Sequence, residues 1–340
     1  MFESPGAADL AAWQRRHGPL GPDAKPALVL AGTDGAWVET LDGRRLLDFS
    51  CGGVLPLGHN HPAVLEAQAK SVHTRPGDGQ EWPERLALTH KLAEIAPGGM
   101  NRRVMLCETG REALGQAICL AQKVTGRRGV MYLTECAEQR PGVSPDKAAV
   151  IVHPFDARVE SVAESCAASG TLLIDDESLI APGTSGRMLA IEWTEARPDF
   201  VVLGTGLAAG ESIGACIAGK AAWHWDRAVS GPGPMASAVA LEYLRLLEQG
   251  LVESGRVIAG KLKQGLAAIA GRAELYGAGL ALSLRLPTPD AAQKLAGKCL
   301  SGGLLLARVG RRSIGVWPPL VATADEIEQA VSIIAQAKAG

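Results

Sequence analysis

Two short stretches of the sequence place acidic or hydroxyl side chains directly after an apolar run. The apolar run at residues 172–174 ends in the acidic side chains Asp175, Asp176 and Glu177. The run at residues 200–203 ends in a glycine turn that contains Thr205. Short apolar runs closed by acids or glycines are typical of buried parallel strands, whose carboxyl ends carry the sites of α/β proteins. The two stretches therefore predict one site, with carboxylates available for acid–base chemistry.

The spacing of apolar residues predicts the elements that must position this site. Helices are expected at 62–72, 83–95, 111–124, 157–169, 234–248, 251–269, 290–299 and 324–337, with a weaker one at 7–16. Strands are expected at 104–107, 129–133, 149–153, 279–286, 303–307 and 313–316. A hairpin of residues 36–40 and 45–49 precedes them, because Leu41, Asp42 and Gly43 form a turn signal.

A family resemblance extends from about Gly32 to the C-terminus. The segment "LLIDDES…GTSGRMLAIEW…RPDFVVLGTGLAAGESIGA" resembles the one that in class III, pyridoxal-phosphate-dependent aminotransferases usually reads "LLI-DEVQTGFGRTG-FA-E…PDI-LGKGLGGG-P-GA". The resemblance implies the α/β fold type I, with a mostly parallel central sheet flanked by helices and a smaller α+β domain from the two termini. It divides the chain into an N-terminal segment of the small domain (1–44), a large domain (45–235) and a C-terminal small domain (236–340).

The same resemblance assigns the residues around the cofactor. In the family, the lysine between two glycines holds pyridoxal phosphate as a Schiff base, and Thr205 stands at that position. Asp176 matches the aspartate that keeps the pyridine nitrogen protonated and makes the ring an electron sink. A threonine hydroxyl forms no stable imine, and Lys220, fifteen residues on, lies beyond another predicted strand. We therefore expect no covalent cofactor, so that pyridoxal phosphate could bind only non-covalently.

The phosphate end of the cofactor is implied by a second motif. "ETGREA" resembles the family's "N-S-G-[ST]-E-A", which implies that Thr109, Gly110 and Arg111 meet the phosphate at a helix N-terminus. Arg111 replaces a hydroxyl residue there but can still clamp an anion. The family's threonine that crosses the dimer to the phosphate falls at Val229 or Ser230. We therefore expect a homodimer or a dimer with a paralogue.

Several other family features are missing together. The segment 134–139 has no aromatic residue where the family stacks a ring on the pyridine, and His153 stands where glutamate is usual. Leu179 replaces a glutamine and Thr184 an arginine, and the loops that cover the cofactor are absent. This pattern indicates a site released from holding pyridoxal phosphate.

Three functions follow from these observations. The first is a degenerate aminotransferase homologue with a binding or partner role, which could include a small-molecule or anion ligand. The second is an enzyme that uses the same pocket for a lysine-independent reaction on a small amine or keto acid. The acting groups would be among Asp176, Glu177, His153, Arg111 and the cysteines, with His153 the most attractive base. The third is a genuine aminotransferase with atypical pyridoxal phosphate binding.

Other classes of protein are disfavoured. The 34 Lys and Arg against 36 Asp and Glu give a net charge of -2, which predicts neither nucleic-acid nor membrane binding, and we expect a cytoplasmic protein. The "GTGLAA" turn matches a dinucleotide fingerprint, but no strand ending in an acid follows about twenty residues on.

Metal and disulfide chemistry are also not expected. His59 and His61 form an H-x-H pair, but no third ligand stands at a suitable spacing in the sequence, so no metal site is predicted. The seven cysteines include no C-x-x-C pair and are expected to be reduced thiols. Cys107 and Cys136 are the two that the resemblance places near the cofactor pocket.

Overall fold

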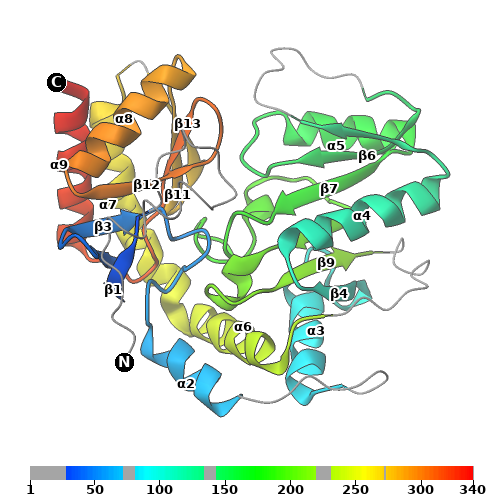
Figure 1. The fold of residues 1–340 in the computed structure, drawn as a ribbon. Coiled ribbons are helices and arrows are strands. Elements are labelled where there is room, and N and C mark those ends of the chain that lie inside the picture. The colour runs from blue at the N-terminus through cyan, green and yellow to red at the C-terminus, as the bar shows by residue number, and fades with distance from the viewer. Residues whose placement is uncertain (1–27, 72–80, 134–142, 220–230, 272, 340) are drawn as a thin grey trace, which may run out of the picture.

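Two sheets lie side by side in the molecule (Figure 1). The structure is a computed structural model that describes residues 28–71, 81–133, 143–219, 231–271 and 273–339. Within these residues, none of the helices is both long and apolar enough to span a membrane. The predicted helix at 7–16 falls outside the described residues.

The larger half contains a six-stranded sheet in the order β4-β9-β8-β7-β6-β5. β5 to β8 run parallel, and β9 is antiparallel to both of its neighbours. The strands are β4 (Arg103–Cys107), β5 (Gly129–Tyr132), β6 (Lys147–Val152), β7 (Leu172–Glu177), β8 (Phe200–Leu203) and β9 (Gly214–Ala218). The prediction of a mostly parallel central sheet is confirmed.

Helices cover both faces of this sheet, which is why its strands are apolar on both sides. On one face, Ala113 and Ala117 of α4 (Gly110–Thr125) are fully buried with Ile174, Phe200 and Val202. The small alanines let α4 lie close to the strands. On the other face, α3 (Pro83–Ile95) and α6 (Pro234–Leu246) pack against each other and share a core with β8.

The second sheet has seven strands in the order β1-β2-β3-β12-β13-β11-β10. They are β1 (Leu30–Asp34), β2 (Trp37–Thr40), β3 (Arg45–Phe49), β10 (Glu274–Ala278), β11 (Ala281–Arg285), β12 (Leu304–Arg308) and β13 (Ser313–Val316). The parallel pair β3–β12 joins the N-terminal strands to the C-terminal ones. A smaller α+β unit made from both ends of the chain is thereby confirmed. The boundary expected after residue 44 falls between β2 and β3 of this sheet, and the three domain ranges stay predictions.

The remaining helices connect and cover the sheets. They are α2 (Pro62–Lys70), α5 (Val159–Ser169), the π-helical turn η5 (Leu247–Leu251), α7 (Val252–Ala270), α8 (Pro289–Ser301) and α9 (Ala324–Ala339), with short 3-10 turns η1 (Gly99–Asn101), η2 (Ala190–Trp193) and η3 (Thr205–Ala208). α7, α8 and α9 pack on the seven-stranded sheet, and α6, η5 and α7 run from one half of the molecule to the other (Figure 1).

Candidate functional site

The three predicted catalytic residues lie at one edge of the six-stranded sheet. β7 and β8 are parallel neighbours, with Asp176 beside Val202, and Thr205 follows β8 as the first residue of η3. β6 pairs with the other side of β7, with Val152 beside Asp175, so that His153 follows at the same edge. The structure therefore brings Thr205, Asp176 and His153 to the ends of three adjacent strands.

Strand alternation separates the acidic side chains of β7. Ile174 packs with α4, while Leu173 packs with the core on the opposite face. Asp176 therefore lies on the α4 face, where it is half-buried and its Oδ1 accepts a hydrogen bond of 3.0 Å from the amide of Ser178. Asp175 and Glu177 belong to the opposite face. Only Asp176 faces the helix that the resemblance links to the cofactor phosphate.

Asp175 and Glu177 form a fully buried carboxyl pair. Glu177 accepts hydrogen bonds of 2.8 Å from the amides of Ala190 and Ile191. In the described part of the chain no N–H or O–H group of another residue donates to Asp175, whose carboxyl faces that of Glu177. Burial, with Glu177 adding to it, raises the pKa of Asp175 well above its usual range. Burial also raises the pKa of Glu177 to about 7, against the lowering effect of the two amides.

The start of α4 reaches the same edge. Thr109 caps the helix, with its Oγ1 accepting a hydrogen bond of 3.1 Å from the amide of Glu112, and Glu112 Oε2 accepts one of 2.9 Å from the amide of Glu108. Arg111 is exposed. The predicted roles of Thr109, Gly110 and Arg111 at a phosphate stay predictions, and Ser230 lies outside the described residues.

Close backbone packing joins the start of α4 to the turn before Thr205. A Cβ on Gly110 would lie 2.9 Å from Ser178 Cβ and 3.0 Å from Gly204 Cα. A Cβ on Gly204 would lie only 2.2 Å from the carbonyl oxygen of Ser178. Glycine is needed at both positions because another backbone segment occupies the space a side chain would take. Thr205 directly follows this closely packed turn as the first residue of η3.

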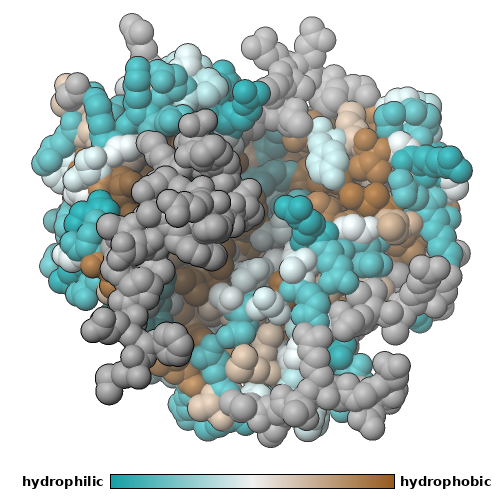
Figure 2. Space-filling model, viewed as in Figure 1, coloured by the Kyte–Doolittle hydropathy of each residue, from teal (hydrophilic) through white to brown (hydrophobic). Residues whose placement is uncertain are grey.

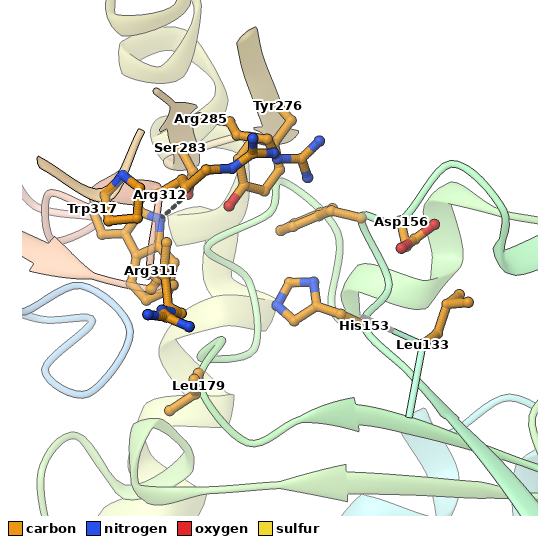
Figure 3. A pocket seen from close by; sticks show the side chains of 14 residues that line it. Leu133, His153, Asp156, Leu179, Tyr276, Ser283, Arg285, Arg311, Arg312 and Trp317 are labelled. Carbon is orange, nitrogen blue, oxygen red and sulfur yellow. Dashed lines mark hydrogen bonds between the residues drawn. The ribbon is translucent and has the colours of Figure 1, made fainter. Parts of the chain in front are cut away.

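A cavity of about 770 Å³ opens between the two sheets. Figure 3 shows its lining side chains, most of which come from residues just after β6, from β10 and β11, and from the connection between β12 and β13. They are Leu133, His153, Phe155, Asp156, Leu179, Tyr276, Ser283, Arg285, Pro289, Val309, Gly310, Arg311, Arg312 and Trp317. His153 therefore faces this cavity, with its ring 5.6 Å from that of Phe155. On the face of the molecule that Figure 2 shows, apolar residues (brown) gather in patches that hydrophilic residues (teal) border.

The sequence did not indicate the surroundings of His59. Its Nε2 lies 3.0 Å from Asp48 Oδ2, and the thiol of Cys51 donates to the carbonyl oxygen of Asp48 at 3.1 Å. One ligand atom from each of these three residues lies within 4.8 Å of the others. His61 is separate, because its Nδ1 accepts a hydrogen bond from the amide of Ala63 at the start of α2. The two histidines are thus engaged separately, and the expectation of no metal site stays a prediction.

The cysteine near the start of α4 is not activated. Cys107 is buried at the end of β4, and burial raises the pKa of its thiol to about 12. A thiol is a weak nucleophile compared with a thiolate, so Cys107 packs as a small apolar side chain. Cys136 lies outside the described residues.

The arrangement of sheets and helices defines a class of protein, the fold type I aminotransferases. The crystal structure of acetylornithine aminotransferase from Elizabethkingia anophelis has a TM-score of 0.82 and 20% sequence identity, over 98% of this chain and 99% of that one. An omega-aminotransferase from Paracoccus denitrificans has a TM-score of 0.83 and 17% identity, over 97% of this chain and 98% of that one. At these identities the likeness shows the fold.

The sequence narrows the class to one family. The sequence model of class III aminotransferases matches residues 21–137 and 148–337. Acetylornithine aminotransferase 1 of Bordetella bronchiseptica is 29% identical over 368 residues, which cover 88% of this chain and 92% of the relative. The acetylornithine aminotransferase of Mycobacterium tuberculosis is 28% identical and covers 91% of each chain. The chain belongs to the class III aminotransferase family, which depends on pyridoxal phosphate, and the predicted family is confirmed.

The residues at the sheet edge do not fit a covalently held pyridoxal phosphate. Thr205 presents a hydroxyl, and residues 148–219 contain no lysine. Thr184, at the position of a family arginine, is buried and donates its hydroxyl to the carbonyl oxygen of Ala181 at 2.7 Å. Leu179, at the position of a family glutamine, has an apolar side chain that is 55% exposed. Asp176 lies on the α4 face of β7, and its role beside the pyridine nitrogen stays a prediction.

Proposed function

We propose that this class III aminotransferase-family protein does not carry out standard transamination and serves as a binding or partner protein. The proposal rests on the threonine at residue 205, which the family resemblance places at the position of the Schiff-base lysine. The proposal includes a dimer, either with a second copy or with a paralogue, a cytoplasmic location, and pyridoxal phosphate bound at most non-covalently.

In standard transamination, the lysine at the position of Thr205 has three roles. The amine holds the aldehyde, exchanges with the amine of the substrate, and moves a proton at the reacting carbon. A hydroxyl forms no stable imine, and without a neighbouring base it is a poor proton acceptor near neutral pH. Asp176 cannot take over the first two of these tasks, because a carboxylate does not condense with an aldehyde.

A second function is favoured by the position of His153. This side chain lines the cavity and leaves from the end of β6, the strand next to Asp176. An imidazole is suited to move protons near neutral pH. A lysine-independent reaction on a small amine or keto acid is therefore our second candidate, and it predicts turnover that is lost on changing His153→Gln.

A turnover assay tests the first proposal. The purified chain is incubated with pyridoxal phosphate, 2-oxoglutarate and either ornithine or N-acetylornithine, with the Bordetella bronchiseptica relative as positive control. We expect no glutamate above the rate given by pyridoxal phosphate alone. Glutamate formation that scales with the amount of this chain would contradict the proposal and support an aminotransferase with atypical cofactor binding.

A further inference from the structure

The cavity between the two sheets is lined by charged side chains of both signs, and two of them, Asp156 and Arg285, are balanced by neighbours. Asp156 Oδ2 lies 2.7 Å from Arg158 Nη2, and Arg158 Nε donates to Asp156 Oδ1 at 2.8 Å. Arg285 Nη1 lies 2.9 Å from Glu274 Oε2. Each of these two pairs is close to neutral.

Two further arginines are not balanced in this way. Arg311 and Arg312 lie in the connection between β12 and β13, and both line the cavity. In the part of the chain that the structure describes, neither guanidinium group makes an ion pair or a hydrogen bond. Figure 3 shows both side chains on the side of the cavity opposite His153. The cavity therefore carries two positive charges with five N–H donors each, and none of these donors has an acceptor among the residues that the structure describes.

Flat apolar surfaces flank these two arginines. Trp317 is 8% exposed, and its Nε1 donates to Ser283 Oγ at 3.3 Å. The guanidinium of Arg285 lies 4.8 Å from the centre of the Tyr276 ring, which holds that ring in place. Phe155 adds a third aromatic side chain to the lining. Aromatic walls of this kind favour a ligand with a flat body.

We propose that this cavity binds a small organic acid with a flat apolar body, whose carboxylate is held by Arg311 and Arg312. The inference deepens the proposed binding role and rests on it. Planar guanidinium forks match a carboxylate with two parallel hydrogen bonds. The cavity volume of about 770 Å³ lies within the range of about 300–1,000 Å³ that is usual for small-molecule sites. The acid is recognised by side chains of the seven-stranded sheet and not by the start of α4.

The same geometry disfavours an amine. Asp156 is the lining carboxylate, and its oxygens already accept from Arg158. The hydrogen bonds from Arg158 lower the pKa of Asp156, against the raising effect of burial, so it stays ionised within its pair. A cationic ligand would meet the two unbalanced arginines without a free acceptor to compensate.

Two probes that share a phenylpropyl skeleton but carry opposite charges test the inference. Titration calorimetry would compare 3-phenylpropanoate with 3-phenylpropan-1-amine on the full chain without pyridoxal phosphate. We expect one saturable site for the acid and no saturable binding of the amine. The double variant R311Q/R312Q should lower the affinity for 3-phenylpropanoate at least about tenfold, because the charged hydrogen bonds to the carboxylate are lost. The control Arg308→Gln removes an exposed charge of β12 outside the cavity and should leave the affinity unchanged.

A second variant keeps the test informative if the arginine variants fold poorly. Leu179→Glu adds a carboxylate at an exposed position of the cavity wall. Because two negative charges repel each other, it should also lower the affinity for 3-phenylpropanoate at least about tenfold. Equal affinity of wild type and R311Q/R312Q, tight binding of the amine, or no saturable binding of the acid would each overturn the inference. Glutamate formation in the turnover assay would contradict the proposed function. The calorimetry uses no cofactor, so it tests acid binding by Arg311 and Arg312 independently of that result.

Discussion

The sheet edge at Thr205 and the cavity between the sheets differ in what they are built from. The edge is made of closely packed small residues, where Gly110 and Gly204 leave no room for a side chain. The cavity is made of long charged and aromatic side chains around a volume of about 770 Å³. Close backbone packing therefore leaves little space at the edge, whereas the cavity presents the long side chains that we propose bind a ligand.

The largest effect is expected when a substitution restores the missing amine and, with it, covalent attachment of the cofactor. Thr205→Lys places a primary amine on the first residue of η3, beside the end of β7. With pyridoxal phosphate we expect a borohydride-reducible adduct of about one per chain, because an amine condenses with an aldehyde and a hydroxyl does not. Intact-mass measurement after reduction checks this.

The matched control is Thr205→Arg, which adds positive charge but no amine that condenses. It should give no adduct. If folded Thr205→Lys also formed no adduct, the lysine alone would not restore cofactor binding. Other residues of the sheet edge would then also prevent it.

A smaller effect is expected from the backbone packing of the edge. Gly204→Ala places a Cβ 2.2 Å from the carbonyl oxygen of Ser178, so the turn must shift. We expect a loss of about 1–3 kcal/mol in the free energy of unfolding by urea. Gly115→Ala in α4, where nothing lies within 4 Å, should instead stabilise by about 0.5–1 kcal/mol. Equal effects of the two substitutions would contradict the close packing.

The smallest effect concerns the buried carboxyl pair on the far face of β7. Burial raises the pKa of Asp175 and Glu177 in the folded state, so the folded chain binds protons more tightly than the unfolded one. The free energy of unfolding must therefore fall as the pH rises from the ordinary value of Glu177, 4.5, toward its folded value of about 7.

Asp175→Asn removes one of the protons taken up on folding. The decline in stability between pH 5 and 7 should become shallower by about 1 kcal/mol per pH unit. Denaturant unfolding at several pH values measures the slope. Glu164→Gln, an exposed change on α5, should leave the slope as in wild type. An unchanged slope for Asp175→Asn would mean that the pair is not proton-linked to folding.

Much of the fold could be predicted because its interior strands and helices have clear apolar periods. α3 matches its predicted residues, 83–95, and the hairpin of β2 and β3 forms as expected. β1 and β10 were missed. Both are edge strands of the seven-stranded sheet with mostly half-buried or exposed residues, so their sequences lack an apolar run.

The candidate site was predictable only in part. His153, Asp176 and Thr205 could be placed together, because each follows or ends an apolar strand of one parallel sheet. The cavity could not, because Tyr276 of β10 and Arg312, in the connection between β12 and β13, lie more than a hundred residues from His153 in the sequence. Contacts between distant segments depend on how the two sheets pack, and local periodicity does not contain that information.

We propose that no side chain of the wild-type chain holds pyridoxal phosphate as a stoichiometric Schiff base, because Thr205 stands where the family resemblance places the lysine. This proposal is tested most directly by incubating the wild-type chain with the cofactor, reducing with borohydride, and mapping peptides by mass, with Thr205→Lys as positive control. We expect no single site of the wild-type chain to carry one pyridoxyl group per chain. Stoichiometric modification of one wild-type side chain would contradict the proposal.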